Sequence, residues 1–152
     1  MTRLFSQRAL LIAALFTLLL ASVALSYNAP RHPVVFQRML AMSEARQTLM
    51  RLNDMAHGRA IFHPERAEID RRALIRFTRS IRKLFRRNVM DSHSRAKPDI
   101  WESRDEFRAR ARFAQVSARA VNAKSPETLR ETLPGLLQTC LVCHTRFRVE
   151  GR

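Results

Sequence analysis

Apolar residues recur every three or four positions through most of the chain after residue 33, which is the spacing of an amphipathic helix. The two-residue alternation typical of half-buried strands is absent, and the sequence has only 3 glycines. Four segments show the helical spacing: residues 34–61, residues 64–87, a segment that starts near residue 103, and a segment that starts at residue 125. Four helices, each with one apolar stripe, predict an all-α protein folded as an antiparallel four-helix bundle.

Prolines and a polar stretch mark the ends of the first two segments. Pro33 suits the first turn of a helix, and Pro64 lies beyond the end of the first segment. The second and third segments are separated by residues 88–101, a polar stretch that ends in Trp101. We expect this stretch to be the longest connection of the bundle.

The last two segments carry clear start signals. Ser103 is followed three residues later by Glu106, which predicts a capping box at the start of the third helix. Ser125 precedes Pro126, which predicts an N-cap followed by a first-turn proline. Residues 134–135, Pro-Gly, fall inside the fourth segment, so we expect them to kink or break that helix.

Residues 1–26 have the plan of a secretory signal peptide. Arg3 and Arg8 precede an uninterrupted apolar run of 17 residues, Ala9–Leu25, and small residues lie just before Tyr27. The alternative is an uncleaved membrane anchor, since about 20 apolar residues usually span a bilayer. In either case residues 27–152 are exported and form one domain.

The charge is strongly positive and is carried mostly by arginine. Lysine and arginine total 28 residues against 13 acidic residues, a net charge of +15, and lysine occurs only at positions 83, 97 and 124. Such a charge suggests nucleic-acid binding first, but export argues against that partner. Attraction to an anionic membrane surface or to an acidic protein fits better, and a solvated arginine-rich surface is the simplest alternative.

The only two cysteines, Cys140 and Cys143, lie three residues apart and are followed directly by His144. This C-x-x-C-H pattern is the attachment motif of a c-type haem. Two thiols on one helical turn can form thioether bonds to the two vinyl groups of a single porphyrin, and the adjacent imidazole can bind the iron. The motif therefore predicts one covalent haem c near the C-terminal end of the last helix.

Three other interpretations of the cysteines stay open at this point. They could be half of a zinc site, but the remaining histidines are scattered and offer no matching pair. They could be a redox-active thiol pair, although such pairs usually open a helix after a strand. They could also be two buried structural thiols.

Three stretches together make the chain resemble the class II cytochromes c, the cytochrome c′ family. They are "CLVCHTRFR" near the C-terminus, "EARQTLM" in the first segment, and "KPDIWESRDEF" before the third. The resemblance spans residues 34–150 and implies a left-handed bundle in which His144 is the proximal iron ligand. It also implies that Arg46 lies near a haem propionate and that Arg148, the basic position of the C-terminal motif, contacts the cofactor. Following the family, we expect the first helix to continue past Gly58 to Ile61, although glycine there would suit a C-cap.

The resemblance also implies which residue faces the sixth coordination position of the iron, namely Met50. A methionine at this position indicates a six-coordinate, low-spin electron carrier, because thioether sulfur is a suitable haem ligand and raises the reduction potential. The alternative is that Met50 only fills space in the core.

The sequence thus predicts a periplasmic one-electron carrier that is not an enzyme. Its expected partner is a redox protein, for which the positive charge favours an acidic one; contact with a membrane surface and pairing into a homodimer are the other options. Two other functions remain: a five-coordinate protein that binds nitric oxide or carbon monoxide, and a thiol protein without haem.

Overall fold

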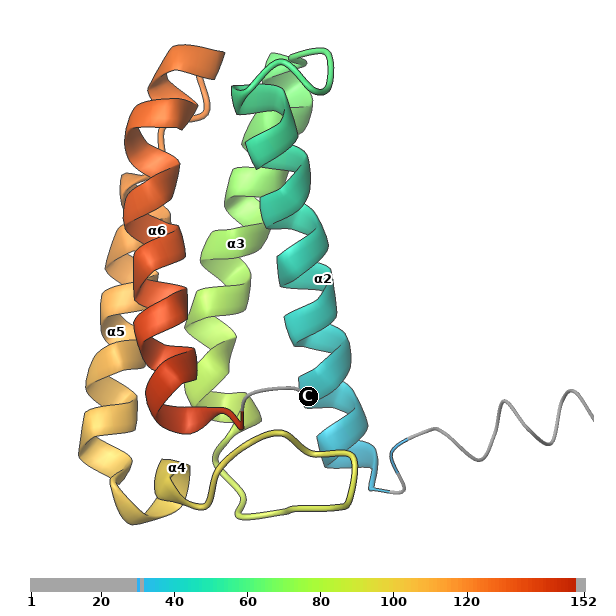
Figure 1. Ribbon diagram of the computed structural model, residues 1–152, viewed down its shortest axis with the longest axis vertical. Helices are drawn as coiled ribbons and strands as arrows, with labels where there is room; N and C mark the ends of the chain where they lie inside the picture. Colours follow the sequence, from blue (N-terminus) through green and yellow to red (C-terminus); the bar gives the residue numbers. More distant parts are fainter. Residues whose placement is uncertain (1–29, 31, 150–152) are drawn as a thin grey trace, which may run out of the picture.

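The computed structural model describes residue 30 and residues 32–149 of the chain, and these residues fold as an antiparallel four-helix bundle (Figure 1). The long helices are α2 (Pro33–Ala56), α3 (Pro64–Leu84), α5 (Arg104–Ala120) and α6 (Pro126–Phe147), and α4 (Asp99–Glu102) is a single turn. The predicted all-α fold class is confirmed. Within residues 32–149, strand-like pairing is limited to one isolated bridge between Ala96 and Arg148.

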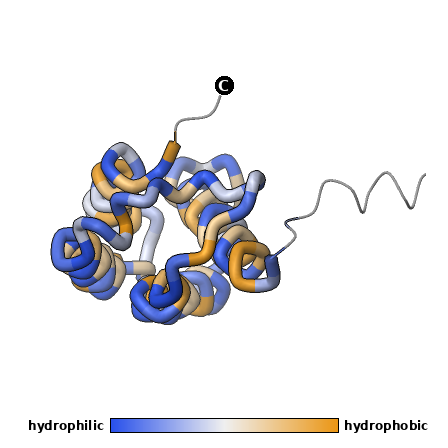
Figure 2. Tube along the Cα trace, turned by 90° about the horizontal axis from the view of Figure 1, so that it is seen from below, coloured by the Kyte–Doolittle hydropathy of each residue, from blue (hydrophilic) through white to orange (hydrophobic). Residues whose placement is uncertain are grey.

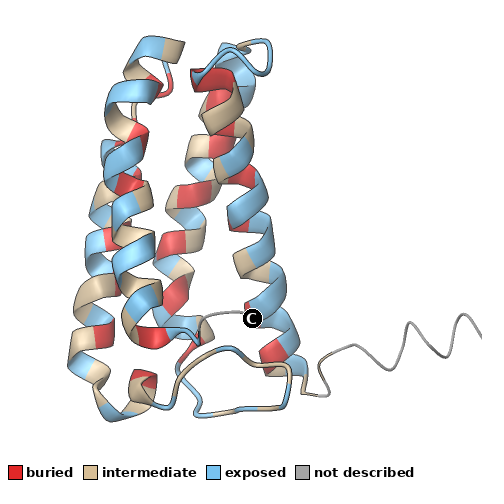
Figure 3. Cartoon of the chain, in the orientation of Figure 1, coloured by how far each residue is buried: buried red, intermediate tan, exposed pale blue. Residues whose placement is uncertain are grey.

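Each long helix packs against two of the others. Helix α2 contacts α3 and α6, and α5 contacts the same two helices from the opposite side. Seen end-on, the four helices therefore stand around a common centre (Figure 2). Their buried positions lie on the sides that face one another (Figure 3), as the apolar stripes predicted.

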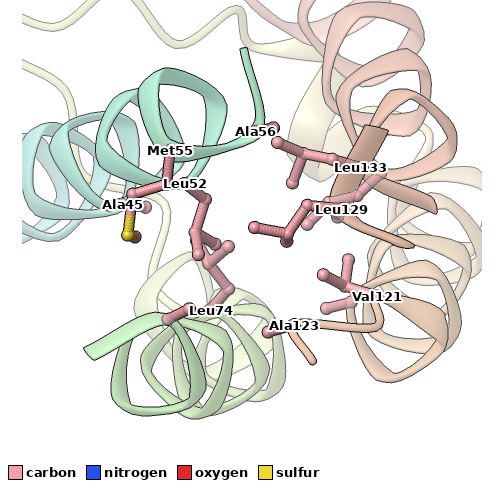
Figure 4. Close-up of a cluster of buried hydrophobic side chains, with 12 residues drawn as sticks. Ala45, Leu52, Met55, Ala56, Leu74, Val121, Ala123, Leu129 and Leu133 are labelled. Carbon is pink, nitrogen blue, oxygen red and sulfur yellow. The ribbon is translucent and has the colours of Figure 1, made fainter. Parts of the chain in front are cut away.

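The core is divided into two clusters along the length of the bundle. The large cluster, shown in Figure 4, lies at the end with the 57–63 and 121–125 connections. The small cluster lies at the α4 end and includes three phenylalanines, Phe85, Phe107 and Phe147, whose rings meet edge to face at centroid distances of 5.4 and 5.3 Å. Phe77 packs against both clusters, so the two cores meet beside this residue.

A buried arginine fixes the first turns of α2 to the end of α3. Arg38 is only 3% exposed and donates three hydrogen bonds to the backbone carbonyls of Leu84, Arg87 and Val89. Its guanidinium also lies 4.8 Å from the ring centroid of Phe85. Because these acceptors are carbonyls that α3 leaves unpaired at its C-terminus or that belong to the following loop, Arg38 joins three segments of chain.

Two of the four long helices begin with a side-chain cap. Ser125 accepts a hydrogen bond from the Thr128 amide while the Thr128 side chain accepts one from the Ser125 amide, which completes a capping box at the start of α6. His32 caps α2 through Nδ1, a role that the sequence did not indicate. The capping box predicted at Ser103 is wrong, because that hydroxyl accepts a hydrogen bond from Arg146 instead of a helix amide.

Several predicted helix limits are also wrong. Helix α2 ends at Ala56 and not at Ile61, because Gly58 takes a left-handed φ of 71° that ends the helix. Helix α3 ends at Leu84, three residues earlier than expected. Residues 99–101, the last part of the expected connection, belong to α4, which runs from Asp99 to Glu102.

The expected break at residues 134–135 does not occur, since α6 is continuous from Pro126 to Phe147. Both Pro134 and Gly135 are exposed on the outer side of the helix. The proline removes one N–H from the helical ladder, and at an exposed site water can satisfy the freed carbonyl. The cost is therefore too small to break a helix whose opposite side is held in the core.

The proposed signal peptide, residues 1–26, lies outside the described residues. Among the helices that the structure does describe, none combines the length and apolar character needed to cross a bilayer.

Candidate functional site

The last three turns of α6 bring Cys140, Cys143 and His144 onto one side of the helix, as positions three and four residues apart require. All three side chains are partly buried. Cys140 packs against the large cluster and Cys143 against the small cluster. The motif therefore lies where the two halves of the core meet.

Burial sets the protonation state of the three groups. It raises the pKa of Cys143 to about 11 and also raises the pKa of Cys140, so both are thiols at neutral pH. Neither is in a disulfide. Burial, with the positive charge of Arg148, lowers the pKa of His144. A neutral imidazole has the lone pair that a metal ligand needs.

Backbone hydrogen bonds hold the end of α6 that carries His144. The Arg148 amide donates to the His144 carbonyl at 2.8 Å and ends the helix. Beyond it, the Lys97 amide donates to the Phe147 carbonyl at 2.9 Å and the Val149 amide donates to the Arg95 carbonyl at 2.8 Å. The residues before α4 therefore brace the last turn of α6 from one side.

Arg146 braces the same turn from another side. Its guanidinium forms ion pairs with Asp99 of α4 and Glu106 of α5, and it donates to the Ser103 hydroxyl at 3.2 Å. The pairing with Arg146 is the main reason why the pKa of Asp99 lies below its ordinary value. Sequence reasoning missed this residue because one arginine among many gives no signal of its partners.

Two residues on the core-facing side of α2 pack against the same apolar clusters as the two cysteines. Met42 packs against the small cluster, like Cys143, and Leu49 packs against the large cluster, like Cys140. Residues 42 and 49 lie about 10 Å apart along the helix axis. Met50 follows directly and is 49% exposed, so its thioether is not committed to the core.

The register of α2 at this level is fixed by a buried carboxylate. Asp70 of α3 is 1% exposed and accepts hydrogen bonds of 3.0 and 2.8 Å from Arg51, with a longer contact of 3.4 Å to Arg66. Arg51 also donates to the buried Thr48 hydroxyl at 3.1 Å. These contacts hold the turn of α2 that carries Met50 against α3.

The two arginines assigned by resemblance are both exposed. Arg46 forms no hydrogen bond or ion pair with the residues that the structure describes, and Arg148 is the residue that ends α6. Partial burial, together with the nearby charge of Arg95, lowers the pKa of Arg148. Their expected contacts with a cofactor remain predictions.

The residues present fit a covalently bound haem. Two thiols and a neutral imidazole project from one side of α6 at the junction of two apolar clusters, and aromatic and aliphatic side chains of α2 and α3 complete the surroundings. Among residues 32–149, no group of three or more His, Cys, Asp or Glu side chains is placed to hold a metal ion on its own. The zinc alternative therefore finds no additional ligands in this part of the chain.

Comparison with known proteins gives a consistent result. The family profile described as "Cytochrome C′" matches residues 33–148, while no curated protein matches the chain. The solved cytochrome c′ from Rhodobacter spheriodes superposes with a TM-score of 0.71 at 22% identity, covering 78% of this chain and 96% of that one. The cytochrome c′ from Rhodopseudomonas palustris gives a TM-score of 0.71 at 21% identity, covering 80% of this chain and 100% of that one.

A third solved structure is a ferrous variant of cytochrome c′ from Alcaligenes xylosoxidans with bound nitric oxide. It superposes with a TM-score of 0.70 at 16% identity, covering 78% of this chain and 94% of that one. At these identities the solved structures show that the fold is shared.

Proposed function

The chain belongs to the cytochrome c′ family and binds one covalent haem c; from this premise we propose that Cys140 and Cys143 form the thioether bonds and that His144 binds the iron. Each thiol adds its sulfur and hydrogen across one vinyl group, so no leaving group is needed. The supporting observation is the place of the three residues, side by side at the junction of the two core clusters. A planar group attached there would have apolar contacts on both sides.

The function that this site supports best is one-electron transfer without substrate turnover. When bound, haem supplies an iron that alternates between two oxidation states one electron apart. The chain's own residues hold the group rigidly: Arg146 and the 95–97 segment brace the last turn of α6, and Asp70 braces α2. Rigid, partly buried surroundings exclude water and set the reduction potential. Exported, as residues 1–26 predict, the protein would act in the periplasm.

Met50 is proposed as the sixth ligand. Its support is positional: Met50 follows Leu49, which packs in the same cluster as Cys140, and about half of its side chain is free of protein contacts. Thioether sulfur stabilises ferrous haem and gives a low-spin iron. On this assignment the carrier keeps six ligands in both oxidation states.

The test is the optical spectrum of Met50→Ala, with Met39→Ala as the matched control. Met39 lies on the same helix and is 42% exposed, so both substitutions remove a similar side chain from a similar surface. We expect Met50→Ala to convert a low-spin spectrum to a high-spin one with the haem still attached, while Met39→Ala leaves it unchanged. A wild-type spectrum that is already high-spin would refute the ligand assignment.

The second candidate function is gas binding at a five-coordinate iron. The observation that favours it is the nitric oxide bound in the solved relative from Alcaligenes xylosoxidans. On this alternative Met50 stands beside an open position and controls access to it. Adding carbon monoxide to the reduced protein separates the two: a shifted spectrum supports gas binding, and an unchanged one supports the electron carrier.

An acidic redox protein is the proposed partner of the carrier. The net charge of +15 would steer such a partner and make the association rate fall as salt is added. Stopped-flow reduction at increasing ionic strength measures this dependence. A second copy of the chain is the other proposed partner, and sedimentation velocity of the haem-loaded protein tests it.

A further inference from the structure

The outer side of α3 carries a long stretch of uncompensated positive charge. Between Arg72 and Arg87 the chain has seven basic residues and no acidic one; they are Arg72, Arg76, Arg79, Arg82, Lys83, Arg86 and Arg87. All seven are exposed, and only Arg72 forms an ion pair with any described residue. The acidic residues of α3, at positions 65, 68 and 70, are confined to its first two turns.

The C-terminal end of this charged stretch lies beside the start of α2. The three hydrogen bonds of Arg38 bring the two segments together. Between them is a pocket of about 400 Å³ to which α2 contributes Val34 and Gln37, and its only charged groups are Lys83, Arg86 and Arg87. No carboxylate lines it, so the pocket is a concave cationic surface.

Two large apolar side chains are also exposed on the first two turns of α2. Phe36 and Leu40, one turn apart on α2, are 49% and 48% exposed although each is large enough to be costly in water. In the sequence, the 17-residue apolar run Ala9–Leu25 precedes α2 by fewer than ten residues. The described chain therefore enters the bundle at the end that carries both these exposed apolar groups and the exposed cations.

The carboxylates at this end do little to neutralise the cations. The Asp91 carboxylate accepts hydrogen bonds from two backbone amides in its own turn and from the amide of residue 32, and its side chain is only 10% exposed. Asp99 and Glu106 are paired with Arg146. Glu102 and Asp105 are exposed, but Arg108 pairs with the latter.

We propose that this end of the bundle, formed by the first two turns of α2, the last two turns of α3 and the residues 85–87 that follow α3, docks on an anionic lipid bilayer. Arginine and lysine side chains bind phosphate-bearing head groups, while Phe36 and Leu40 enter the interface between head groups and acyl chains. An acidic protein would satisfy the cations but gives no reason for the exposed apolar pair at the same end of the bundle.

Vesicle sedimentation tests this proposal with haem-loaded protein of residues 27–152. The bundle is a folding unit, since it covers 100% of the solved Rhodopseudomonas palustris chain. The probes are phosphatidylcholine vesicles and vesicles in which about one third of the lipid is phosphatidylglycerol. We expect binding only to the anionic vesicles, and we expect it to weaken as salt rises from about 0.1 M to about 1 M.

Two charge variants locate the surface. Lys83→Gln with Arg86→Gln and Arg87→Gln removes three cations from the docking end; Arg112→Gln with Arg119→Gln and Lys124→Gln removes three exposed cations elsewhere. Each cation near the lipid surface strengthens binding about fivefold, so the first variant should lose about 100-fold and the second much less. The double variant Phe36→Ser with Leu40→Ser should also weaken binding, without changing the haem spectrum.

The outcomes are distinct. Equal losses in the two charge variants would show that the overall charge, and not this surface, attracts lipid, and would overturn the proposal. Absence of binding to anionic vesicles, with capture by an acidic protein instead, would also overturn it. None of these substitutions touches Cys140, Cys143, His144 or Met50, so a failure here leaves the proposed haem function standing.

Discussion

Replacing Arg38 with methionine should lower the free energy of unfolding by about 2–4 kcal/mol. The guanidinium donates three hydrogen bonds, of 2.8, 2.6 and 2.5 Å, to carbonyls at the end of α3 and in the loop that follows. Hydrogen bonds from a charged donor contribute about 1.5–3 kcal/mol each, so the gross loss is about 4–9 kcal/mol. Two effects reduce it: burial lowers the pKa of Arg38, which shows that the buried cation carries a desolvation cost, and methionine restores apolar packing.

Urea unfolding of the haem-loaded protein, followed by helix circular dichroism, measures this change. The matched control is Arg79→Met on the exposed side of α3, which should stay within about 0.5 kcal/mol of wild type. For a domain of this size, the expected loss at Arg38 corresponds to a melting temperature lower by about 8–16 °C. If the two variants unfold at the same urea concentration, Arg38 does not join the three segments in the way described.

Three further predictions use matched or single substitutions. Gly135→Ala should stabilise the protein by about 1 kcal/mol in thermal unfolding, because the site is exposed, helical and open, whereas Gly58→Ala should destabilise it by about 1–2 kcal/mol because φ there is 71°. Glu68 has a pKa of about 2, lowered by hydrogen bonds from Arg71 and Arg72; since this is below the unfolded value, the ion pairs stabilise above about pH 4.5, and their contribution disappears as the pH falls toward 2. Glu68→Gln should make the free energy of unfolding depend less on pH between about pH 4.5 and pH 2, and an unchanged pH dependence would contradict the assignment. Cys143→Ser should lose one thioether and lower the yield of haem-loaded protein, and the intact mass with the yield measures both.

The spacing of apolar residues was sufficient to predict the four helices and the bundle. It worked because each helix buries one side only, as the stripe Phe107, Ala111, Ala114 and Ala118 of α5 shows. The sequence signals for the ends of helices were less reliable, because contacts with other parts of the fold compete for the same side chains. Ser103 has the sequence of a cap, yet its hydroxyl accepts from Arg146, 43 residues away in the chain.

The candidate haem residues were predictable because they are consecutive in sequence and their spacing has a chemical reason. The residues that hold them in place were not. Asp70, Arg38 and Arg146 act through partners far away in the sequence, and nothing in the sequence indicates that Asp70 and Arg38 are buried. Gly58 gives the opposite lesson, since the general rule for a glycine after a helix C-cap was right and the longer helix expected from the family was wrong.

Arginine has two separate roles in this bundle, because the 13 acidic residues are too few to pair with all 28 basic ones. The pairs Arg51–Asp70 and Arg146–Asp99 join different helices, so they are needed for packing. With those carboxylates occupied, the cations at the end of α3 have no ion-pair partner among the described residues and are free to bind an external anion. Salt should therefore affect the two groups differently: partly buried pairs are screened little, whereas lipid binding through exposed cations is screened strongly. Raising the salt to about 1 M should abolish vesicle binding while changing the urea midpoint only slightly, and a parallel loss of both would show that the two sets of arginines are not separate.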